Sequence, residues 1–91
     1  MKFGYARVST KEQNLSLQID ALQKEGCKQI FQEKISGAKA DRPELEKLVQ
    51  QLREGDIIVV WKLDRLGRSL RDLVNLVNEI QDKGAGLKSL N

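Results

Sequence analysis

Two short stretches of this 91-residue chain carry side chains that suit attack on a phosphodiester. In residues 5–10, Ser9 follows Arg7 by two positions, directly after an apolar run. Residues 62–69 follow a second apolar run and contain Asp64, Arg65 and Arg68. A serine hydroxyl is a weak nucleophile that needs assistance, and its attack on phosphorus develops negative charge on the non-bridging oxygens. Arginine stays charged and binds two such oxygens at once, so an arginine cluster can position and stabilise a phosphate without a metal.

Ser9 and Arg7 each have a structural interpretation as well as a chemical one. Residues 9–12 read Ser-Thr-Lys-Glu, which is the spacing of a helix capping box, and spacing alone favours a cap over a nucleophile. Arg7 alternates with Tyr5 and Ser9 along one face of a predicted strand. A solvent-facing arginine is the common alternative, but this strand is expected to be central, where an unpaired arginine is costly. We therefore expect Arg7 to have a phosphate or carboxylate partner.

The other charged candidates lie close to the predicted starts of the second and third helices. Arg42 falls in the first turn of a predicted helix, where a cation is unfavourable against the helix dipole unless an anion is nearby. The same terminus suits a phosphate, and an exposed charge is an equal alternative. Asp64, Arg65 and Arg68 fall in a strand-to-helix connection, for which a solvated loop with an ion pair is the alternative.

Composition narrows the chemistry. The chain is long enough for one small domain, and its 40% hydrophobic and 32% charged residues are typical of a soluble globular protein. It contains no histidine, which argues against a Ser-His-Asp hydrolase and most zinc chemistry. Cys27, the single cysteine, allows no internal disulfide and favours a reducing cytosol. No segment approaches the ~20 apolar residues of a membrane span. The net charge of +3 permits contact with nucleic acid but does not demand it.

The apolar pattern alternates strand and helix along the whole chain. Helices are predicted at residues 15–24, from about 42 to a stop at Gly55, and from 70 to a stop at Gly84; strands are predicted at residues 2–8, 27–32, 57–61 and 86–90. This βαβαβαβ order implies a mainly parallel sheet with helices on both faces. In such sheets ligands bind beyond the carboxyl ends of the strands, where Ser9 and Asp64 both fall.

Local signals mark where the second and third helices begin. Residues 41–44, Asp-Arg-Pro-Glu, predict a cap by Asp41 with proline in the first turn. Residues 69–72, Ser-Leu-Arg-Asp, predict a cap by Ser69. The apolar stripes of these two helices are expected to face the core: Leu45, Leu48, Val49, Leu52, Leu70, Leu73, Val74, Val77 and Ile80.

Read together, residues 5–10 (Tyr-Ala-Arg-Val-Ser-Thr) and 62–69 (Lys-Leu-Asp-Arg-Leu-Gly-Arg-Ser) resemble the catalytic domain of the small serine recombinases, the resolvase/invertase family. The resemblance runs along essentially the whole chain and implies a three-layer α/β fold with strand order 2-1-3-4. It also implies that Ser9 is the nucleophile, in a site with the following residues: Arg7, Arg42, Asp64, Arg65, Arg68 and Gln18. Asp64 would either orient an arginine or manage the proton of the leaving oxygen. For Gln18 a plain amide on the helix surface is the alternative.

The resemblance further implies cleavage of both strands of double-stranded DNA at a crossover site. Each serine would be joined to a 5′ phosphate, and the strands would be exchanged within a homotetramer built from dimers and then rejoined. No metal or nucleotide cofactor and no membrane is implied, and the setting is the bacterial cytoplasm. In this family a dimerisation helix and a helix-turn-helix domain follow the catalytic domain. We therefore expect residues 1–91 to be a catalytic domain truncated before both parts, inactive by itself, folded and prone to self-associate through uncovered apolar surface.

Two other functions are consistent with parts of the sequence. The chain could be a non-catalytic remnant that serves assembly or regulation, which predicts self-association without DNA cleavage. A receiver-like or nucleotide-binding domain ranks last, because it would need an acidic cluster after the first strand or a Gly-Lys-Ser/Thr loop. Residues 84–89 superficially suggest a phosphate loop, but their spacing is wrong and no helix follows them.

Overall fold

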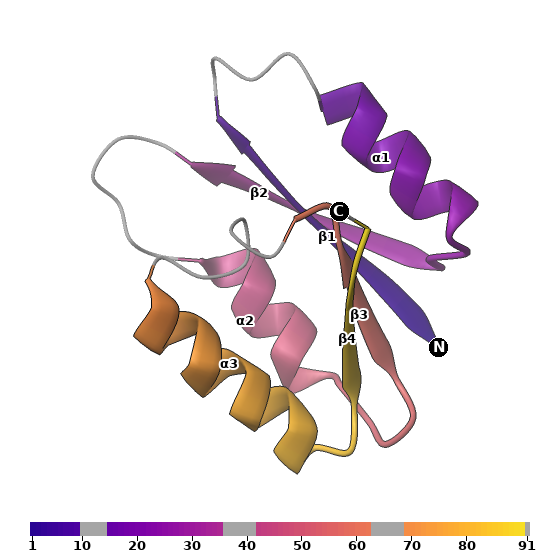
Figure 1. The fold of residues 1–91 in the computed structure, drawn as a ribbon. Helices are drawn as coiled ribbons and strands as arrows, with labels where there is room; N and C mark the ends of the chain where they lie inside the picture. The colour runs from indigo at the N-terminus through magenta and orange to yellow at the C-terminus, as the bar shows by residue number, and fades with distance from the viewer. Residues whose placement is uncertain (10–14, 36–41, 63–68, 91) are drawn as a thin grey trace.

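The computed structural model of the chain describes residues 1–9, 15–35, 42–62 and 69–90. Strands and helices alternate through these ranges as the apolar pattern predicts (Figure 1). In chain order the elements are β1 (Lys2–Ser9), α1 (Leu15–Lys24), β2 (Gln29–Ile35), α2 (Pro43–Gln50), β3 (Ile57–Val60), α3 (Leu70–Asp82) and β4 (Gly86–Ser89).

The four strands form one parallel sheet in the order β2-β1-β3-β4. This confirms the predicted fold class and strand order, including the prediction that the first and third strands are neighbours. β1 is central, as expected for the strand that carries Arg7. All four strands run in the same direction, so β1 and β3 both end toward the same edge of the sheet.

Strand boundaries differ from the prediction, by one residue at the ends of β1 and β4 and more clearly at β2. β2 begins at Gln29 rather than at residue 27, because Cys27 N–H still bonds to the carbonyl of Leu22 at 3.3 Å and completes the turn after α1. The strand then extends to Ile35, beyond the predicted end at residue 32. β3 ends at Val60, so Trp61 lies outside it.

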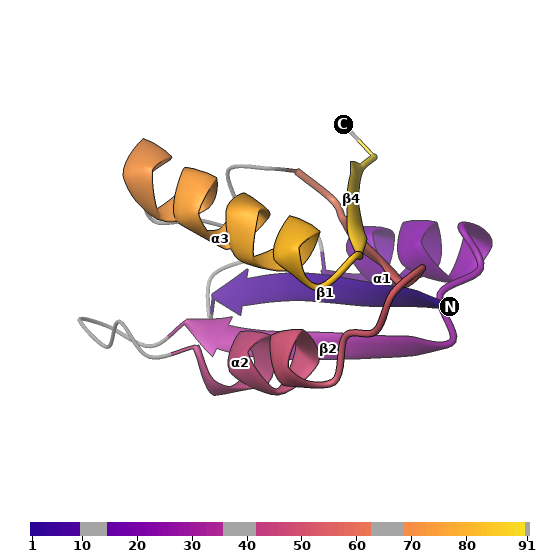
Figure 2. The same cartoon turned by 90° about the horizontal axis from the view of Figure 1, so that it is seen from below.

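The sheet is covered on both faces (Figures 1 and 2). α2 and α3 pack on one face, where the larger apolar cluster includes Phe3, Tyr5, Phe31, Leu48, Ile58, Val60, Leu76 and Ile80. α1 packs on the other face through a smaller cluster that contains Ala6, Leu22 and Val59. Successive residues of β1 and β3 therefore alternate between two cores, as the continuous apolar run of a doubly covered parallel strand predicts. Within the described ranges, none of the helices has the length and apolar character needed to cross a membrane.

The predicted core face of α3 is partly wrong. Leu70 is 78% exposed and Val74 is 48% exposed, whereas Leu76 and Ile80 are buried. The apolar residues of this helix spread over a wide arc, since each step turns the helix by about 100°. Only the part of the arc around Leu76 and Ile80 faces the sheet and α2, and Leu70 and Val74 lie at its outer edge.

The close approach of α1 to β1 depends on a glycine. A Cβ built on Gly4 would lie 3.1 Å from Cγ1 of Ile30 and 3.2 Å from Cδ1 of Leu22. A Cβ on Gly86, in β4, would meet only Cγ1 of Ile57 at 3.8 Å, which is an ordinary contact.

We predict that Gly4→Ala lowers the free energy of unfolding by about 1 kcal/mol, because Leu22 and Ile30 must shift to admit the methyl group. Gly86→Ala is the matched control in a strand and should change stability by no more than about 0.5 kcal/mol. Urea unfolding of the three proteins measures both values. Equal stability of the two variants would contradict this account of α1 packing.

Candidate active site

The carboxyl ends of β1 and β2 bring the first group of candidate residues to one edge of the sheet. Arg7 pairs in register with Glu33, and Tyr5 pairs with Phe31. Residues in register on parallel strands point to the same face, and Tyr5 and Phe31 belong to the core beneath α2 and α3. Arg7 and Glu33 therefore extend that face toward the edge. Ser9 is the last residue of β1, which is the predicted position at the exit of the central strand.

Glu33 is a buried carboxylate that caps α2. Its side chain accepts hydrogen bonds from the backbone N–H of Leu45 at 3.2 Å and of Glu44 at 3.2 and 3.4 Å, and the hydroxyl of Tyr5 donates to it at 3.5 Å. A carboxylate at a helix N-terminus is favourable because it satisfies unpaired N–H groups and opposes the helix dipole. Glu33 thus performs, from a strand 11 residues earlier in the chain, the task predicted for Asp41.

The N-cap position of α2 also differs from the predicted one by one residue. Arg42 occupies the N-cap position and makes no side-chain cap hydrogen bond; Asp41 lies outside the described residues. Pro43 stands in the first turn, as predicted. The N–H groups of Glu44 and Leu45, which would serve a phosphate at this terminus, are already used by Glu33. Any phosphate bound here would therefore depend on the Arg42 side chain rather than on those two backbone donors.

Arg42 has the anionic neighbour that its position demands. Its Nη2 lies 3.0 Å from Oδ1 and 2.9 Å from Oδ2 of Asp72, in the first turn of α3. Both side chains are mostly buried, with 13% and 27% exposure respectively. Ser69 caps α3 by accepting the N–H of Asp72 at 3.1 Å, which confirms the predicted cap and orients that first turn. The ion pair therefore joins the starts of two helices.

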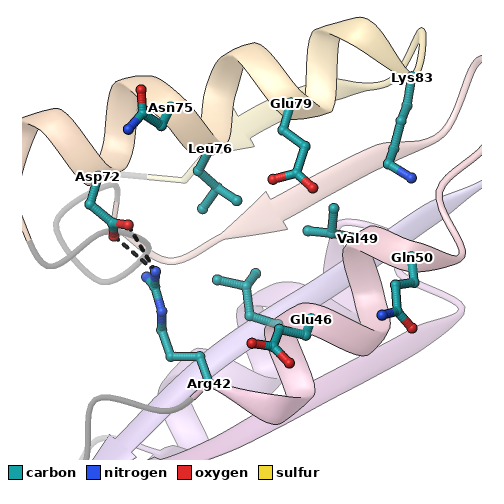
Figure 3. A pocket seen from close by; sticks show the side chains of 10 residues that line it. Arg42, Glu46, Val49, Gln50, Asp72, Asn75, Leu76, Glu79 and Lys83 are labelled. Carbon is teal, nitrogen blue, oxygen red and sulfur yellow. Dashed lines mark hydrogen bonds and ion pairs between the residues drawn. The ribbon is translucent and has the colours of Figure 1, made fainter.

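The ion pair closes one end of a groove between α2 and α3 (Figure 3). The groove has a volume of about 400 Å³, and the side chains of Leu45, Val49 and Leu76 form its apolar floor. Glu46 and Glu79 line it from opposite helices. In Figure 3 Arg42 and Asp72 point toward each other across the end of the groove nearest the carboxyl edge of the sheet.

The charges around Tyr5 show which groups lie close together. Burial, and secondly the Glu33 carboxylate, raise the pKa of Tyr5 far above its ordinary value of 10.0, whereas the guanidinium groups of Arg7 and Arg42 act to lower that pKa. The Glu33 carboxylate and the two guanidinium groups therefore lie close enough to the Tyr5 hydroxyl to shift its pKa. Arg7 is half-buried and its Nε is shielded from solvent. Tyr5, Arg7, Glu33 and Arg42 form one electrostatic cluster at the edge of the sheet.

The remaining predicted site residues divide into two groups. Gln18, in α1, is only 1% exposed, so the alternative of a surface amide is wrong. Its Oε1 is buried without a hydrogen-bond partner among the residues that the structure describes. Asp64, Arg65 and Arg68 lie outside the described residues, and the segment that holds them begins shortly after β3, the neighbour of β1.

Sequence reasoning missed two residues of this site, Glu33 and Asp72. The available signal for Glu33 is an acidic residue at an inward-facing position, two residues after the buried Phe31. Asp72 looked like a routine member of a capping motif, and only the fold brings it to Arg42, 30 residues earlier.

The protein is therefore a three-layer α/β domain with a parallel 2-1-3-4 sheet, and Arg7 and Arg42 lie together near the carboxyl edge of that sheet. Residues 2–91 match the family described as the resolvase N-terminal domain, and the chain belongs to that family. This confirms the resemblance drawn from residues 5–10 and 62–69.

Similar proteins include the DNA-invertase of Escherichia phage P1, 57% identical over 90 residues, and the serine recombinase gin of Escherichia phage Mu, 51% identical over 90 residues. Both alignments cover 99% of this chain, with 48% of the first protein and 47% of the second. The chain thus spans about half the length of the curated relatives it matches.

Solved structures agree with this fold. The C-terminal catalytic domain of ISC1926 TnpA, an IS607-like serine recombinase, has a TM-score of 0.79 at 19% identity, over 99% of this chain and 67% of that one. A serine recombinase from Sulfolobus solfataricus has a TM-score of 0.78 at 24% identity, over 99% of this chain and 67% of that one. At these identities the likeness extends to the fold alone.

Tyr5 is the single tyrosine, so its titration can be followed directly. We predict that the folded chain develops no tyrosinate absorbance near 295 nm at pH 10 to 11, whereas the chain unfolded in urea titrates near its ordinary pKa. The folded chain keeps this proton to higher pH than the unfolded chain does. The contribution of Tyr5 to stability is therefore complete below pH 10 and falls above it by about 1.4 kcal/mol per pH unit.

Tyr5→Phe is the control for other groups that titrate in this range, such as lysines. The difference in unfolding free energy between the original chain and Tyr5→Phe should carry the predicted slope above pH 10. A tyrosinate signal with a midpoint near pH 10 in the folded chain would contradict the burial of this hydroxyl.

We also predict that Gln18→Met raises the free energy of unfolding by about 1 kcal/mol, because it replaces a buried carbonyl, which has no hydrogen-bond partner within the described ranges, with an apolar group of similar shape. Gln23→Met, at an exposed position of the same helix, should change stability by less than about 0.5 kcal/mol. Urea unfolding measures both. A loss of more than 1 kcal/mol in Gln18→Met would mean that the carbonyl of Gln18 is satisfied in solution.

Proposed function

We propose that residues 1–91 form the catalytic core of a site-specific DNA recombinase, in which the hydroxyl of Ser9 attacks a DNA phosphodiester. The observation that carries the proposal is the position of Ser9 at the end of the central strand, two residues beyond Arg7, on the edge where α2 presents Arg42. Relatives named DNA-invertase, serine recombinase and resolvase, which align over 99% of the chain, support it.

The proposed step exchanges one phosphate ester for another. A bond forms between Oγ of Ser9 and phosphorus, and the bond from phosphorus to the 3′ oxygen breaks. The product is a 5′-phosphoserine and a free 3′ hydroxyl. The serine hydroxyl loses one proton and the leaving 3′ oxygen gains one, so the step is balanced. The covalent link keeps the ester bond energy, so rejoining is the reverse of cleavage and needs no nucleotide cofactor.

Arginines supply what this step needs from the protein. Arg7 and Arg42, with Arg65 and Arg68 carried over from the family motif, would hold the non-bridging oxygens as negative charge develops. Asp64 would orient an arginine or manage the proton of the leaving oxygen. Gln18 is buried, so in this conformation its role would be to support neighbouring groups rather than to touch DNA.

Recombination as a whole needs more than this domain. We propose that the domain works in a bacterial cytoplasmic protein in which a dimerisation helix and a helix-turn-helix domain follow it, and that dimers bound to double-stranded crossover sites pair into a tetramer. The exposed side chains of Leu70 and Val74 on α3 are apolar surface that such an assembly could cover.

The test is a hybrid in which residues 1–91 replace the aligned half of the serine recombinase gin, assayed on the DNA site of that recombinase. A 3′-bridging phosphorothiolate at the cleavage position traps the adduct, because its thiolate leaving group rejoins poorly. We predict that Ser9→Ala lowers the yield of covalent protein–DNA adduct at least about 1,000-fold, since no other group replaces the nucleophile.

Ser16→Ala, at an exposed position in the first turn of α1, is the control and should retain the adduct. An adduct that survives Ser9→Ala would overturn the assignment of the nucleophile. A folded hybrid that binds its site but forms no adduct would favour the non-catalytic assembly remnant instead.

A further inference from the structure

We propose that Glu33 is a positioning residue for Arg42, through which the buried carboxylate on β2 sets where this arginine meets a DNA phosphate. The proposal rests on the proposed function, because the phosphate-binding role of Arg42 belongs to it. Glu33 itself is 4% exposed and would not touch the DNA.

The main chain of Arg42 is fixed by its neighbours in α2. Its carbonyl accepts the N–H of Glu46 at 3.0 Å, so it is the first residue bonded into the helix. The next N–H groups, those of Glu44 and Leu45, bond to Glu33. Since the Arg42 side chain makes no capping hydrogen bond, the contact with Glu33 determines where α2 starts relative to the sheet.

The guanidinium of Arg42 is fixed separately, by Asp72 on α3. Glu33 therefore controls the base of this side chain and Asp72 its tip. If the first turn of α2 shifted, the guanidinium could keep its ion pair with Asp72 or keep its place at the carboxyl edge. It could not keep both. A displacement of about 1 Å in a group that positions substrate can cost on the order of 100-fold in rate.

The negative charge of Glu33 contributes more than its shape. Both carboxylate oxygens accept N–H bonds from α2, and charge-assisted bonds of this kind are roughly twice as strong as neutral ones. Glutamine can reproduce the bonds to Oε1 but places an NH₂ donor where Oε2 accepts. Glu33→Gln should therefore leave the domain folded while it loosens the start of α2.

The first arm of the test uses the 91-residue chain and NMR of arginine side chains. In Glu33→Gln the Nε–Hε resonance of Arg42 should shift toward the position of an unrestrained arginine, and the effect of Asp72→Asn on that resonance should become smaller. Glu54→Gln removes an exposed charge from the turn that follows α2, away from Arg42, and should leave the resonance of Arg42 unchanged. An unchanged Arg42 resonance in folded Glu33→Gln would overturn the proposal.

The second arm measures single-turnover DNA cleavage by the gin hybrid. Glu33→Gln should slow cleavage about 10-fold in the original hybrid and less than 2-fold in an Arg42→Ala hybrid, because a residue that acts through Arg42 has nothing left to position. Glu54→Gln should leave the rate within 2-fold of the original. Equal slowing by Glu33→Gln in both backgrounds would mean general destabilisation and would overturn the proposal.

The two arms separate the two possible failures. If the unaltered hybrid forms no adduct, the proposed function fails, and the NMR arm still decides whether Glu33 positions Arg42. If the hybrid cleaves DNA and Glu33→Gln changes neither the rate nor the resonance, the positioning role fails and the proposed function stands.

Discussion

The arrangement of this site depends on one buried carboxylate. Glu33 lies in the second strand beneath α2, where an unpaired charge would be strongly unfavourable. Its bonds to Glu44, Leu45 and Tyr5 remove most of that penalty. The same bonds attach α2 to β2 at the carboxyl edge of the sheet. The same hydrogen bonds therefore stabilise the buried charge and fix the position of α2.

From this contact, side chains of alternating charge lie next to one another across the edge of the domain. Glu33 lies beside Arg7 in register, Arg42 begins the helix that Glu33 caps, and Asp72 pairs with Arg42 and begins α3. In this described part, two carboxylates balance two arginines. The proposed site adds Asp64, Arg65 and Arg68, which leaves one positive charge in excess. That excess matches the single negative charge of a phosphodiester.

The sequence predicted those features that depend on local pattern. The order of elements, the span of α1 and the cap by Ser69 each follow from apolar spacing or from a residue type at a helix end. The features it predicted wrongly depend on contacts between elements. The cap of α2 is Glu33 because the sheet brings β2 to that helix, and Leu70 and Val74 are exposed because α3 presents only one part of its apolar arc to the core.

The same division applies to the site. The sequence made Ser9 and Arg42 candidates, but it could not show what holds Arg42, because its partner Asp72 is 30 residues away in the chain. That partner changes the chemistry expected of the arginine. In the proposed function, a phosphate meets a guanidinium whose charge is already opposed by a carboxylate at 2.9 Å, so Arg42 alone offers little net attraction. Binding must then come from the arginines acting together, which makes the relative placement of Arg7 and Arg42, rather than the presence of either one, the property on which the site depends.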